Sequence, residues 1–360
     1  GNTNSGAYVF DLQGADVVTI RGVGITGAQY GVFAGSSADS DRISIVDSWV
    51  YSNSVRGVEL QGSNDFVVLA GNRVWGNGSG GINLNGTDVL VQGNEVLRNG
   101  SAGIDLNGER ARVLDNDVYG QTGWGIQVNG SSTAGVAASV VQGNRVFSNA
   151  YGISGAYSTL VQDNDVWGNT SGQGIQLYYG GAKAEGNRVW GNASYGIYVY
   201  FATATGNQVW ANASHGIYSD YGSETAYNRI YGNGEAGVYL GIYDGWVHNN
   251  LIEANAGPGV LVNGASFSSS TPRVENNTIA ATGAANAITV QGSTSSIWLR
   301  NNILDVRGTG HGIFVASDSQ RGFISDHNLF MLGSQAKLGW WEDRAFGNLT
   351  GTLMAGAPAL

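Results

Sequence analysis

The amino-acid sequence predicts an all-β solenoid, and two repeated markers carry that prediction. The first marker is the segment Asn187-Arg-Val-Trp-Gly-Asn192, which returns as Asn207-Gln-Val-Trp-Ala-Asn212. The second marker is a Gly-Ile or Gly-Val pair that follows each such segment, as at Gly196 and Gly216. Because the two markers move together along the chain, each repeat corresponds to one structural turn.

The spacing of the first marker sets the length of each turn. Its first Asn recurs at steps of 20 to 28 residues, at Asn72, Asn94, Asn116, Asn144, Asn164, Asn187, Asn207, Asn228, Asn250, Asn277, Asn302 and Asn328. Each turn of about twenty-two residues contains short stretches with a period of two residues, and none with the 3.6-residue period of a helix. The sequence therefore predicts a single-stranded right-handed parallel β-helix of about twelve coils, with about three short strands per coil.

Irregular coils come first along the chain, regular coils follow, and a different segment comes last. Residues 1–50 contain two expected strands, over residues 17–20 and 43–45, and the coils from residue 57 to residue 265 are the most regular. Two insertions rich in Ser, Thr, Ala and Gly, at residues 130–138 and 264–272, are expected to be loops. We expect the β-helix over residues 1–328 and a C-terminal capping segment over residues 329–360, which contains Trp340, Trp341, Phe346 and Met354.

The composition fits an ordered solenoid without thiol chemistry. The chain has 360 residues, with 58 Gly, 3 Pro, 42% hydrophobic residues and 12% charged residues. Gly suits turns with positive φ, whereas Pro is excluded from inner strands. The net charge of −10 argues against nonspecific binding of nucleic acid as a function class. Zero Cys excludes disulfides and thiolate metal sites, and no apolar run approaches the length of a membrane span.

The Asn-x-Val-x-x-Asn…Gly-Ile-x-Leu unit resembles the generic repeat of right-handed parallel β-helix proteins over residues 20–330. That repeat is shared by pectate lyases, alginate lyases, the catalytic modules of mannuronan epimerases, NosD-like proteins and many large bacterial surface proteins. The resemblance implies the fold and an extracellular or cell-surface location of bacterial type. It leaves the function open, because one fold hosts many activities.

One outward row of side chains is aromatic, and we call it the aromatic stripe. Alternation along Asn-x-Val-x directs Val inward and the residue after Val outward. Stacking of the coils aligns these outward residues as Tyr51, Trp75, Leu97, Tyr119, Phe147, Trp167, Trp190, Trp210 and Tyr231. The residues before Val form a second outward row of mostly charged side chains, Arg73, Glu95, Asp117, Arg145, Asp165, Arg188, Gln208 and Arg229.

Two interpretations of the aromatic stripe remain open. In the first, Trp75, Trp167, Trp190 and Trp210 form a platform that stacks on sugar rings, and Arg188 reaches sugar carboxylates or hydroxyls. In the second, a loop, another domain or a second copy covers the stripe, and the charged residues form cross-strand pairs. The second interpretation includes self-association along the stripe or end to end.

A further outward row lies on the Gly-Ile-x-Leu strand. It reads Glu59, Asn83, Asp105, Gln127, Ser154, Gln176, Tyr198, Tyr218 and Tyr239. In the lyases and epimerases that the repeat resembles, this strand belongs to the sheet with the active-site cleft. The oxygen ligands of its first half suit Ca²⁺, but Glu59 and Asp105 lie two coils, about 10 Å, apart. A hydrogen-bonding ladder is therefore the alternative to a calcium site; the sequence requires no cofactor, and Ca²⁺ is compatible with it.

The tyrosine-rich half of this row contains the best candidate for a catalytic site. His215, Tyr218 and Asp220 belong to one coil, with Tyr198, Tyr200 and Arg229 on neighbouring coils. Abstraction of a proton next to a uronate carboxylate needs a base, such as Tyr218 or His215, and a cation, such as Arg229 or Ca²⁺. A structural role is the alternative, since strict alternation puts His215 out of phase with Tyr218.

Known catalytic signatures are absent from the sequence. Epimerase modules of this fold carry Tyr-Gly-Phe-Asp-Pro-His, whereas this chain has no Asp-Pro dipeptide and no cluster of Asp residues like that of pectate lyases. Two hypotheses for the function follow. The first hypothesis is a secreted protein that interacts with a polysaccharide, and an acidic glycan is favoured as its ligand. In the catalytic version of this hypothesis, the protein is a polyuronate lyase or epimerase. The alternative is a non-catalytic extracellular module, such as a stalk, adhesin or filament subunit.

Overall fold

The computed structural model confirms the predicted fold class. It describes residues 7–62, 64–241, 243–264, 271–342 and 344–346. The fold is an all-β right-handed parallel solenoid with three parallel sheets, A, B and C, and about 14 turns. The number of turns exceeds the predicted twelve because the sheet A strands of the end coils, Tyr8–Asp11 and Lys337–Trp341, carry no Gly-Ile or Gly-Val pair.

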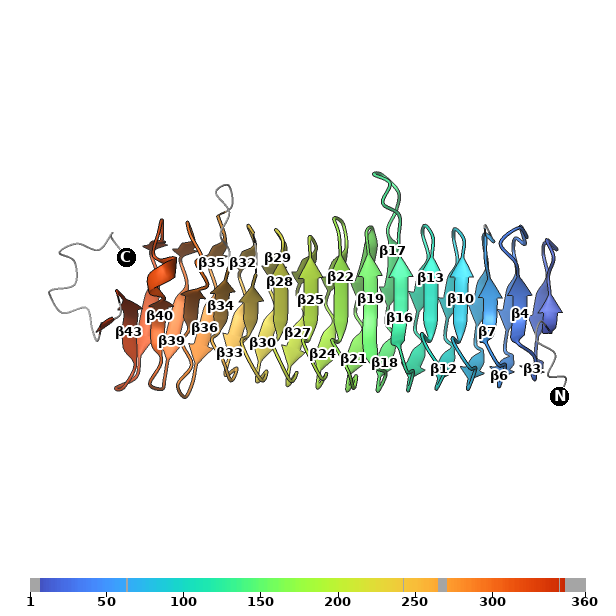
Figure 1. Cartoon of the computed structure of the whole chain (residues 1–360), viewed down its shortest axis with the longest axis horizontal. Coiled ribbons are helices and arrows are strands. Elements are labelled where there is room, and N and C mark those ends of the chain that lie inside the picture. The colour runs from blue at the N-terminus through green and yellow to red at the C-terminus, as the bar shows by residue number, and fades with distance from the viewer. Residues whose placement is uncertain (1–6, 63, 242, 265–270, 343, 347–360) are drawn as a thin grey trace. The chain divides into compact units, whose positions relative to one another are not determined.

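The chain divides into two compact units, Gly1–Arg188 and Val189–Leu360. In the first unit, sheet A contains β1 (Tyr8–Asp11), β4 (Tyr30–Ala34), β7 (Arg56–Leu60), β10 (Ile82–Asn85), β13 (Ile104–Asn107), β16 (Trp124–Asn129), β19 (Tyr151–Ala156) and β22 (Ile175–Tyr178). Sheet B contains β2 (Thr19–Arg21), β5 (Ser44–Val46), β8 (Val68–Ala70), β11 (Leu90–Gln92), β14 (Arg112–Leu114), β17 (Ser139–Gln142), β20 (Thr159–Gln162) and β23 (Lys183–Glu185). Sheet C contains β3 (Gly24–Thr26), β6 (Trp49–Tyr51), β9 (Arg73–Trp75), β12 (Glu95–Leu97), β15 (Asp117–Tyr119), β18 (Arg145–Phe147) and β21 (Asp165–Trp167). In Figure 1, the strands β7, β10, β13 and β16 lie side by side.

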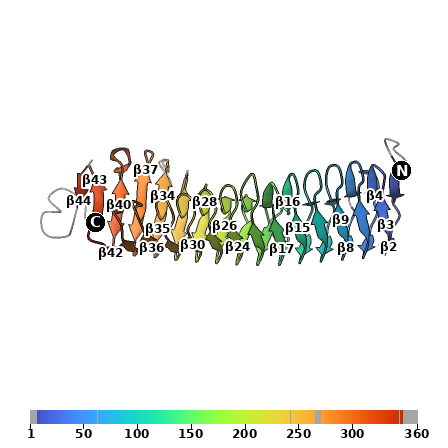
Figure 2. The ribbon, with the colours of Figure 1, turned by 90° about the horizontal axis from the view of Figure 1, so that it is seen from below.

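The second unit repeats this arrangement. Its sheet A contains β25 (Ile197–Tyr200), β28 (Ile217–Asp220), β31 (Val238–Leu240), β34 (Val260–Asn263), β37 (Ile288–Gln291), β40 (His311–Val315), β43 (Lys337–Trp341) and β44 (Arg344–Phe346). Sheet B contains β26 (Thr203–Thr205), β29 (Glu224–Ala226), β32 (Trp246–His248), β35 (Arg273–Glu275), β38 (Trp298–Arg300) and β41 (Ile324–Asp326). Sheet C contains β24 (Arg188–Trp190), which begins at the last residue of the first unit, β27 (Gln208–Trp210), β30 (Arg229–Tyr231), β33 (Leu251–Glu253), β36 (Thr278–Ala281), β39 (Ile303–Val306) and β42 (Leu329–Leu332). Figure 2 shows β34 and β37 as neighbours, and a short 3₁₀ helix, η1, covers Ser317–Ser319.

The core of each unit is a stack of inward aliphatic side chains. The middle residue of each three-residue sheet C strand is fully buried, as at Val74 and Val118 in the first unit and Val209 and Ile230 in the second. This confirms that the Val of the repeat points inward and that its two neighbours point outward. Burial of these aliphatic rows is the main favourable contribution to folding, at about 25 cal/mol per Å² of apolar surface.

Buried amides form two ladders inside each unit. In one ladder each Asn accepts both the backbone N–H and the side-chain Nδ2 of the Asn one coil before it, as Asn116 does from Asn94 at 2.9 Å in both cases. The second ladder runs through Asn77 and Asn99 to Gln121. Because these amides are buried, the ladders satisfy donors and acceptors that would otherwise be costly.

The structure also describes parts of the two insertions and of the C-terminal segment. The segment between β16 and β17 is a loop that projects beyond the neighbouring turns in Figure 1, as expected for residues 130–138. Most of the second insertion, residues 265–270, lies outside the described residues. Beyond Asn328, β42 and β43 still pair in parallel with the preceding coil, whereas β44 pairs antiparallel with β43. The capping role of residues 329–360 stays a prediction, and Met354 lies outside the described residues.

Candidate functional site

Most tyrosines of the second unit gather on the outer side of sheet A. The strands β25, β28 and β31 pair in a register that aligns Tyr198, Tyr218 and Tyr239 across three coils. Further tyrosines lie at the ends of these strands or in the adjoining turns. We call the whole set the tyrosine face, and it consists of Tyr195, Tyr198, Tyr200, Tyr218, Tyr221, Tyr239 and Tyr243, all half-buried.

The rings of the tyrosine face contact one another at varied tilts. The rings of Tyr218 and Tyr239 stack with centroids 4.4 Å apart, whereas Tyr198 meets Tyr218 at 5.3 Å and 38°. Tyr221 meets Tyr200 at 4.5 Å and Tyr243 at 4.3 Å, again tilted by more than 40°. Tilted rings leave parts of their faces and hydroxyl groups at the surface, where they offer both apolar contact and hydrogen bonding.

His215 joins this face through contacts on both ring nitrogens. Its Nδ1 accepts the backbone N–H of Ala236 at 3.1 Å, and its Nε2 lies 3.2 Å from Oε2 of Glu235. Its ring centroid is 6.1 Å from that of Tyr218. Strict alternation does not separate the two residues because His215 precedes β28, which begins at Ile217. Burial lowers the pKa of His215, and Glu235 opposes this shift only in part, which favours the neutral imidazole.

Tyr218 is strongly disfavoured as a phenolate. Burial raises the pKa of Tyr218 well above its usual range, and the neighbouring Tyr239 and Asp220 raise it further. A general base must be deprotonated before it accepts a proton, so this environment suits Tyr218 as a hydrogen-bond or proton donor. The same argument holds for Tyr195, whose pKa is also raised by burial first.

Asp220 ends β28 as a buried carboxylate. Its Oδ1 accepts the backbone N–H of Tyr221 at 3.0 Å, and its backbone carbonyl accepts the hydroxyl of Ser223. A Cβ atom added at Gly241 would lie 2.8 Å from Oδ1 of Asp220, so the backbone of the next coil packs directly on the carboxylate. The carboxylate of Asp220 therefore lies in the wall of the site and not on its exposed surface.

Arg229 lies on a different sheet from the other predicted catalytic residues. It begins β30 of sheet C, where its Nε is 3.3 Å from Oε2 of Glu253 and its guanidinium lies 4.9 Å from the ring centre of Tyr231. The structure thus brings His215, Tyr218, Asp220, Tyr198 and Tyr200 together on sheet A and does not bring Arg229 to them. The strands β25, β28 and β31 contain no Lys or Arg.

In the first unit, the aromatic stripe is a stack of parallel rings. The ring of Trp75 lies on Tyr51 at 4.4 Å and 3°, and Phe147 lies between Tyr119 at 4.8 Å and Trp167 at 4.4 Å. Rings packed face to face at these distances leave no room for a sugar ring between them. They present their edges, and not their faces, to a ligand.

The charged residues beside the stripe pair with one another. In the first unit, Arg73 pairs with Glu95 at 2.8 Å, and Nε of Arg188 donates to Oδ1 of Asp165 at 2.6 Å. The phenol of Tyr119 donates to Glu95 at 2.6 Å. These contacts match the cross-strand pairs of the second interpretation of the stripe, and they occupy Arg188.

The stripe keeps the same geometry in the second unit. The indoles of Trp190 and Trp210 stack at 4.8 Å and 6°, and Trp210 stacks on Tyr231 at 5.8 Å and 3°. All three rings are half-buried. Within each unit, the geometry therefore gives the stripe a stacking role that stabilises sheet C.

The first half of the sheet A row forms hydrogen bonds and ion pairs within the row and with neighbouring side chains. Glu59 is buried, pairs with Arg56, and accepts the amide of Gln61 at 2.7 Å. Asn83 donates to Oδ2 of Asp105 at 3.1 Å, and burial raises the pKa of Asp105. In the described part of the chain, no group of three or more His, Cys, Asp or Glu is arranged to hold a metal ion.

Two residues of this site, Tyr195 and Glu235, lie outside the strand rows that the repeat predicts. Tyr195 contacts both His215 at 5.7 Å and Tyr218 at 4.9 Å, and Glu235 faces the imidazole. Tyr195 lies in the turn before β25, and Glu235 lies in the turn before β31. The sequence contains a signal for this position, since Tyr195 and His215 both stand immediately before the repeated Gly.

Comparisons with known proteins agree with this architecture. The family model described as the right-handed β-helix region matches residues 5–166 and 201–336, and the model described as periplasmic copper-binding protein (NosD) matches residues 134–256. The chain is similar in structure to the A-module of mannuronan C-5 epimerase AlgE6 of Azotobacter vinelandii, with a TM-score of 0.61 and 14% identity over 82% of this chain and 92% of that one. It is also similar to the AlgE4 A-module of the same organism, with a TM-score of 0.52 and 16% identity over 83% and 88% of the two chains. No curated protein matches the sequence.

The copper named in the NosD description does not suit the residues present here. The matched stretch contains no Cys or Met, and its two His residues lie apart in the fold, His215 beside sheet A and His248 on sheet B. Copper sites use clustered imidazole and sulfur ligands. The described residues thus offer no donor set for this metal. They also include no helix with the length and apolar character of a membrane span.

Proposed function

Because the chain belongs to the right-handed β-helix region family, whose fold hosts many activities, we propose its function from its own surface: the protein binds a polysaccharide on the tyrosine face. The observation that carries this proposal is the set of tilted, half-buried tyrosine rings across β25, β28 and β31. Tyrosine combines a flat apolar body with a hydroxyl, which suits a sugar ring with its own apolar face and hydroxyl groups.

The extent of the tyrosine face favours a polymer over a small molecule. Three strands of a sheet span about 10 Å from the first to the third, so the aligned rings form an extended surface. The AlgE6 and AlgE4 A-modules are by name epimerases of mannuronan, a polysaccharide, and this supports a polysaccharide as the ligand class. We further propose an extracellular or cell-surface location of bacterial type, which the periplasmic description of the NosD model supports.

The charges around the tyrosine face favour binding over lyase or epimerase chemistry. Such chemistry on a uronate needs a cation at the sugar carboxylate, whereas the charged residue beside Tyr218 is the carboxylate Asp220 and the one beside His215 is the carboxylate Glu235. The raised pKa of Tyr218 also opposes its action as a base. Catalysis would require Tyr218 as the donor and neutral His215 as the acceptor, with a soluble cation such as Ca²⁺ at the carboxylate.

The proposal is tested by binding of a glycan panel to the whole chain. The panel contains neutral glucans and mannans together with mannuronate, guluronate and galacturonate polymers, and affinity is measured by calorimetry with and without Ca²⁺. In Tyr198→Ala and Tyr239→Ala, we expect affinity to fall by about fivefold to tenfold, the effect of removing one aromatic contact. The control is Tyr157→Ala, because Tyr157 is 37% exposed but lies in the first unit, in the turn after β19.

The same samples separate the alternatives. If glycan affinity is the same in the wild type and in both variants of the tyrosine face, the proposed site is rejected. A rise in absorbance near 235 nm, or exchange of the sugar H5 proton with solvent, would establish lyase or epimerase activity and reassign Tyr218 and His215 to catalysis. No binding to any glycan in the panel would support the non-catalytic structural module.

A further inference from the structure

A second surface with different chemistry lies on sheet B of the second unit. The strands β32, β35 and β38 pair in a register that aligns Trp246, Arg273 and Trp298 on adjacent coils. The next residue of each strand, Val247, Val274 or Leu299, is fully buried, so the aligned residues point outward. Arg300, two residues after Trp298, shares this side of the sheet. We call Trp246, Arg273, Trp298 and Arg300 the Trp–Arg surface.

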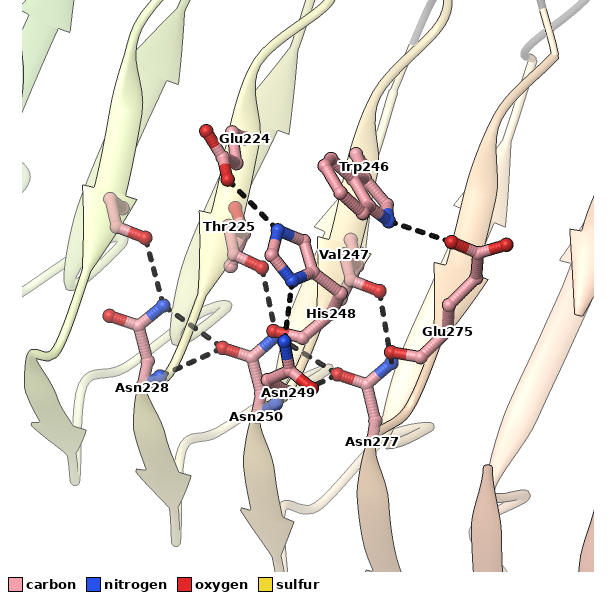
Figure 3. A network of polar contacts seen from close by, with 11 residues as sticks. Glu224, Thr225, Asn228, Trp246, Val247, His248, Asn249, Asn250, Glu275 and Asn277 are labelled. Carbon is pink, nitrogen blue, oxygen red and sulfur yellow. Dashed lines mark hydrogen bonds and ion pairs between the residues drawn. The ribbon is translucent and has the colours of Figure 1, made fainter. Parts of the chain in front are cut away.

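Trp246 is held in place by its neighbours, as Figure 3 shows. Its Nε1 donates to Oε2 of Glu275 at 3.0 Å, and its ring stacks on the imidazole of His248 with centroids 3.8 Å apart. The Nε2 atom of His248 in turn lies 2.9 Å from Oε1 of Glu224. This network fixes one edge of the Trp–Arg surface before any ligand arrives.

Arg273 is available to an incoming anion. Its guanidinium lies 4.6 Å from the ring centre of Trp246, and no carboxylate among the described residues comes within 4.0 Å of its charged nitrogens. The nearby carboxylates already have partners: Glu224 contacts His248, Glu275 accepts from Trp246, and Asp326 contacts Arg300 at 3.5 Å. An exposed Arg that is stacked on an indole keeps its planar edge free for a carboxylate or sulfate.

Trp298 supplies an exposed apolar ring next to that cation. The residue is 41% exposed, and its ring stacks on no other ring among the described residues. A cavity of about 170 Å³ adjoins it, lined by Trp298, Leu299, Arg300, Ile324 and Asp326. An exposed indole beside a cavity and two arginines is unusual on a monomer surface and typical of a binding site.

We propose that the Trp–Arg surface binds an anionic sugar unit of a polysaccharide. The sugar ring stacks on Trp298, its carboxylate or sulfate receives hydrogen bonds from Arg273, and Arg300 closes the far side of the cavity. The tyrosine face is a different site, on sheet A, and its strands carry no Lys or Arg. Rejection of one site therefore leaves the other standing.

The test is calorimetric binding of short oligosaccharides to the full chain. Three arms share a length of about six sugars: oligouronates (galacturonate, mannuronate and guluronate), the same oligomers after reduction of their carboxyl groups to alcohols, and a sulfated oligosaccharide. We expect the anionic arms to bind and the reduced, neutral arm to bind at least tenfold more weakly, which corresponds to about 1.4 kcal/mol. Binding of oligouronate alone identifies a carboxylate ligand, and binding of the sulfated arm alone identifies a sulfate ligand.

Matched variants locate the site. Arg273→Gln and Trp298→Ala are each expected to weaken anion binding by about tenfold or more, as loss of a charge-assisted hydrogen bond or of an aromatic contact does. The controls are Arg21→Gln, an exposed arginine of sheet B in the first unit, and Trp49→Ala, which is 62% exposed on sheet C. Thermal unfolding of each variant checks that it is folded.

Three results would overturn the inference. The first is equal affinity for the anionic and the carboxyl-reduced oligomers, because Arg273 would then have no anion to bind. The second is anion binding that Arg273→Gln and Trp298→Ala leave intact, and the third is no binding by any anionic arm.

Discussion

The imidazole of His215 lies with its Nε2 atom 3.2 Å from Oε2 of Glu235, yet its pKa is lowered. Burial is the larger influence and disfavours the charged ring, while Glu235 favours it and offsets only part of that effect. The folded protein therefore binds this proton less readily than the unfolded chain, in which the histidine pKa is about 6.5.

This difference predicts that acid destabilises the fold through His215. As the pH falls below about 6.5, the unfolded state takes up a proton that the folded state resists, so the free energy of unfolding decreases until the pH reaches the folded pKa. His215→Gln should make unfolding by urea less dependent on pH between about 7.5 and 5. Glu235→Gln should steepen the dependence at the lower end, because it removes the charge that favours the imidazolium. Identical pH profiles for the wild type and both variants would contradict the assignment.

The Asn ladder predicts a large difference between two amide-to-alanine substitutions. In Asn116→Ala, the backbone N–H of Asn94 loses its acceptor, and the hydrogen bond from Nδ2 of Asn116 to the carbonyl of Val91 is lost. The Nδ2 atom of Asn94 keeps the carbonyls of Leu69 and Gln92 as acceptors. A buried group left without a partner costs about 1–3 kcal/mol, so we expect a loss of about 2–3 kcal/mol. In Asn129→Ala, an exposed amide contact to Asn107 at 2.7 Å is lost, and the cost should stay below about 1 kcal/mol.

Thermal unfolding and hydrogen exchange measure this contrast. Repeat proteins unfold in segments, so exchange at the amides of Asn94 and its neighbours reports the local effect of Asn116→Ala. Equal losses of stability in the two variants would show that the ladder contributes little beyond the surface amides.

Much of the fold could be predicted from the sequence because each repeat carries its own evidence. The Asn markers recur at buried ladder positions and the Val residues at fully buried strand centres, so each coil confirms the reading of the one before it. The end coils were undercounted because Tyr8–Asp11 and Lys337–Trp341 pair with their neighbours without a Gly-Ile or Gly-Val pair. Strand pairing there depends on backbone hydrogen bonds that any side chain permits.

The candidate site was harder to predict from the sequence. A row of equivalent positions shows which residues align along one sheet, but it does not show which residues of different sheets lie close together around a coil. Arg229 and Tyr218 belong to adjacent coils in sequence, but β30 and β28 lie on different sheets. His215 could not be placed by alternation because it belongs to a turn, where the period of two ends. The repeat does not predict the Trp–Arg surface, because Trp246, Arg273 and Trp298 follow insertions or loops of different lengths and do not form a regular row in the sequence.

The Gly of the repeated Gly-Ile pair is predicted to be essential for stability, because its position leaves no room for a side chain. A Cβ atom at Gly216 would lie 2.5 Å from Cγ2 of Ile230 and 2.6 Å from the carbonyl oxygen of Gly237. Because one of these neighbours is backbone, Gly216→Ala must shift the coil, and we expect a loss of about 1–3 kcal/mol. Gly180→Ala is the control, since its Cβ would meet nothing within 4 Å, and its effect should be within about 0.5 kcal/mol of zero. Equal melting temperatures for the two variants would refute the close approach.

Trp210 allows the two interpretations of the aromatic stripe to be separated. Its indole stacks on Trp190 at 4.8 Å and on Tyr231 at 5.8 Å, both nearly parallel. Trp210→Ala should lower the free energy of unfolding by about 2 kcal/mol, whereas Trp210→Phe, which keeps a ring in the stack, should cost less than about 1 kcal/mol. We expect neither variant to change glycan affinity, because the faces of the rings are occupied by one another. If Trp210→Ala stayed as stable as the wild type but lost glycan binding, the stripe would be the sugar platform and the tyrosine face would lose that role.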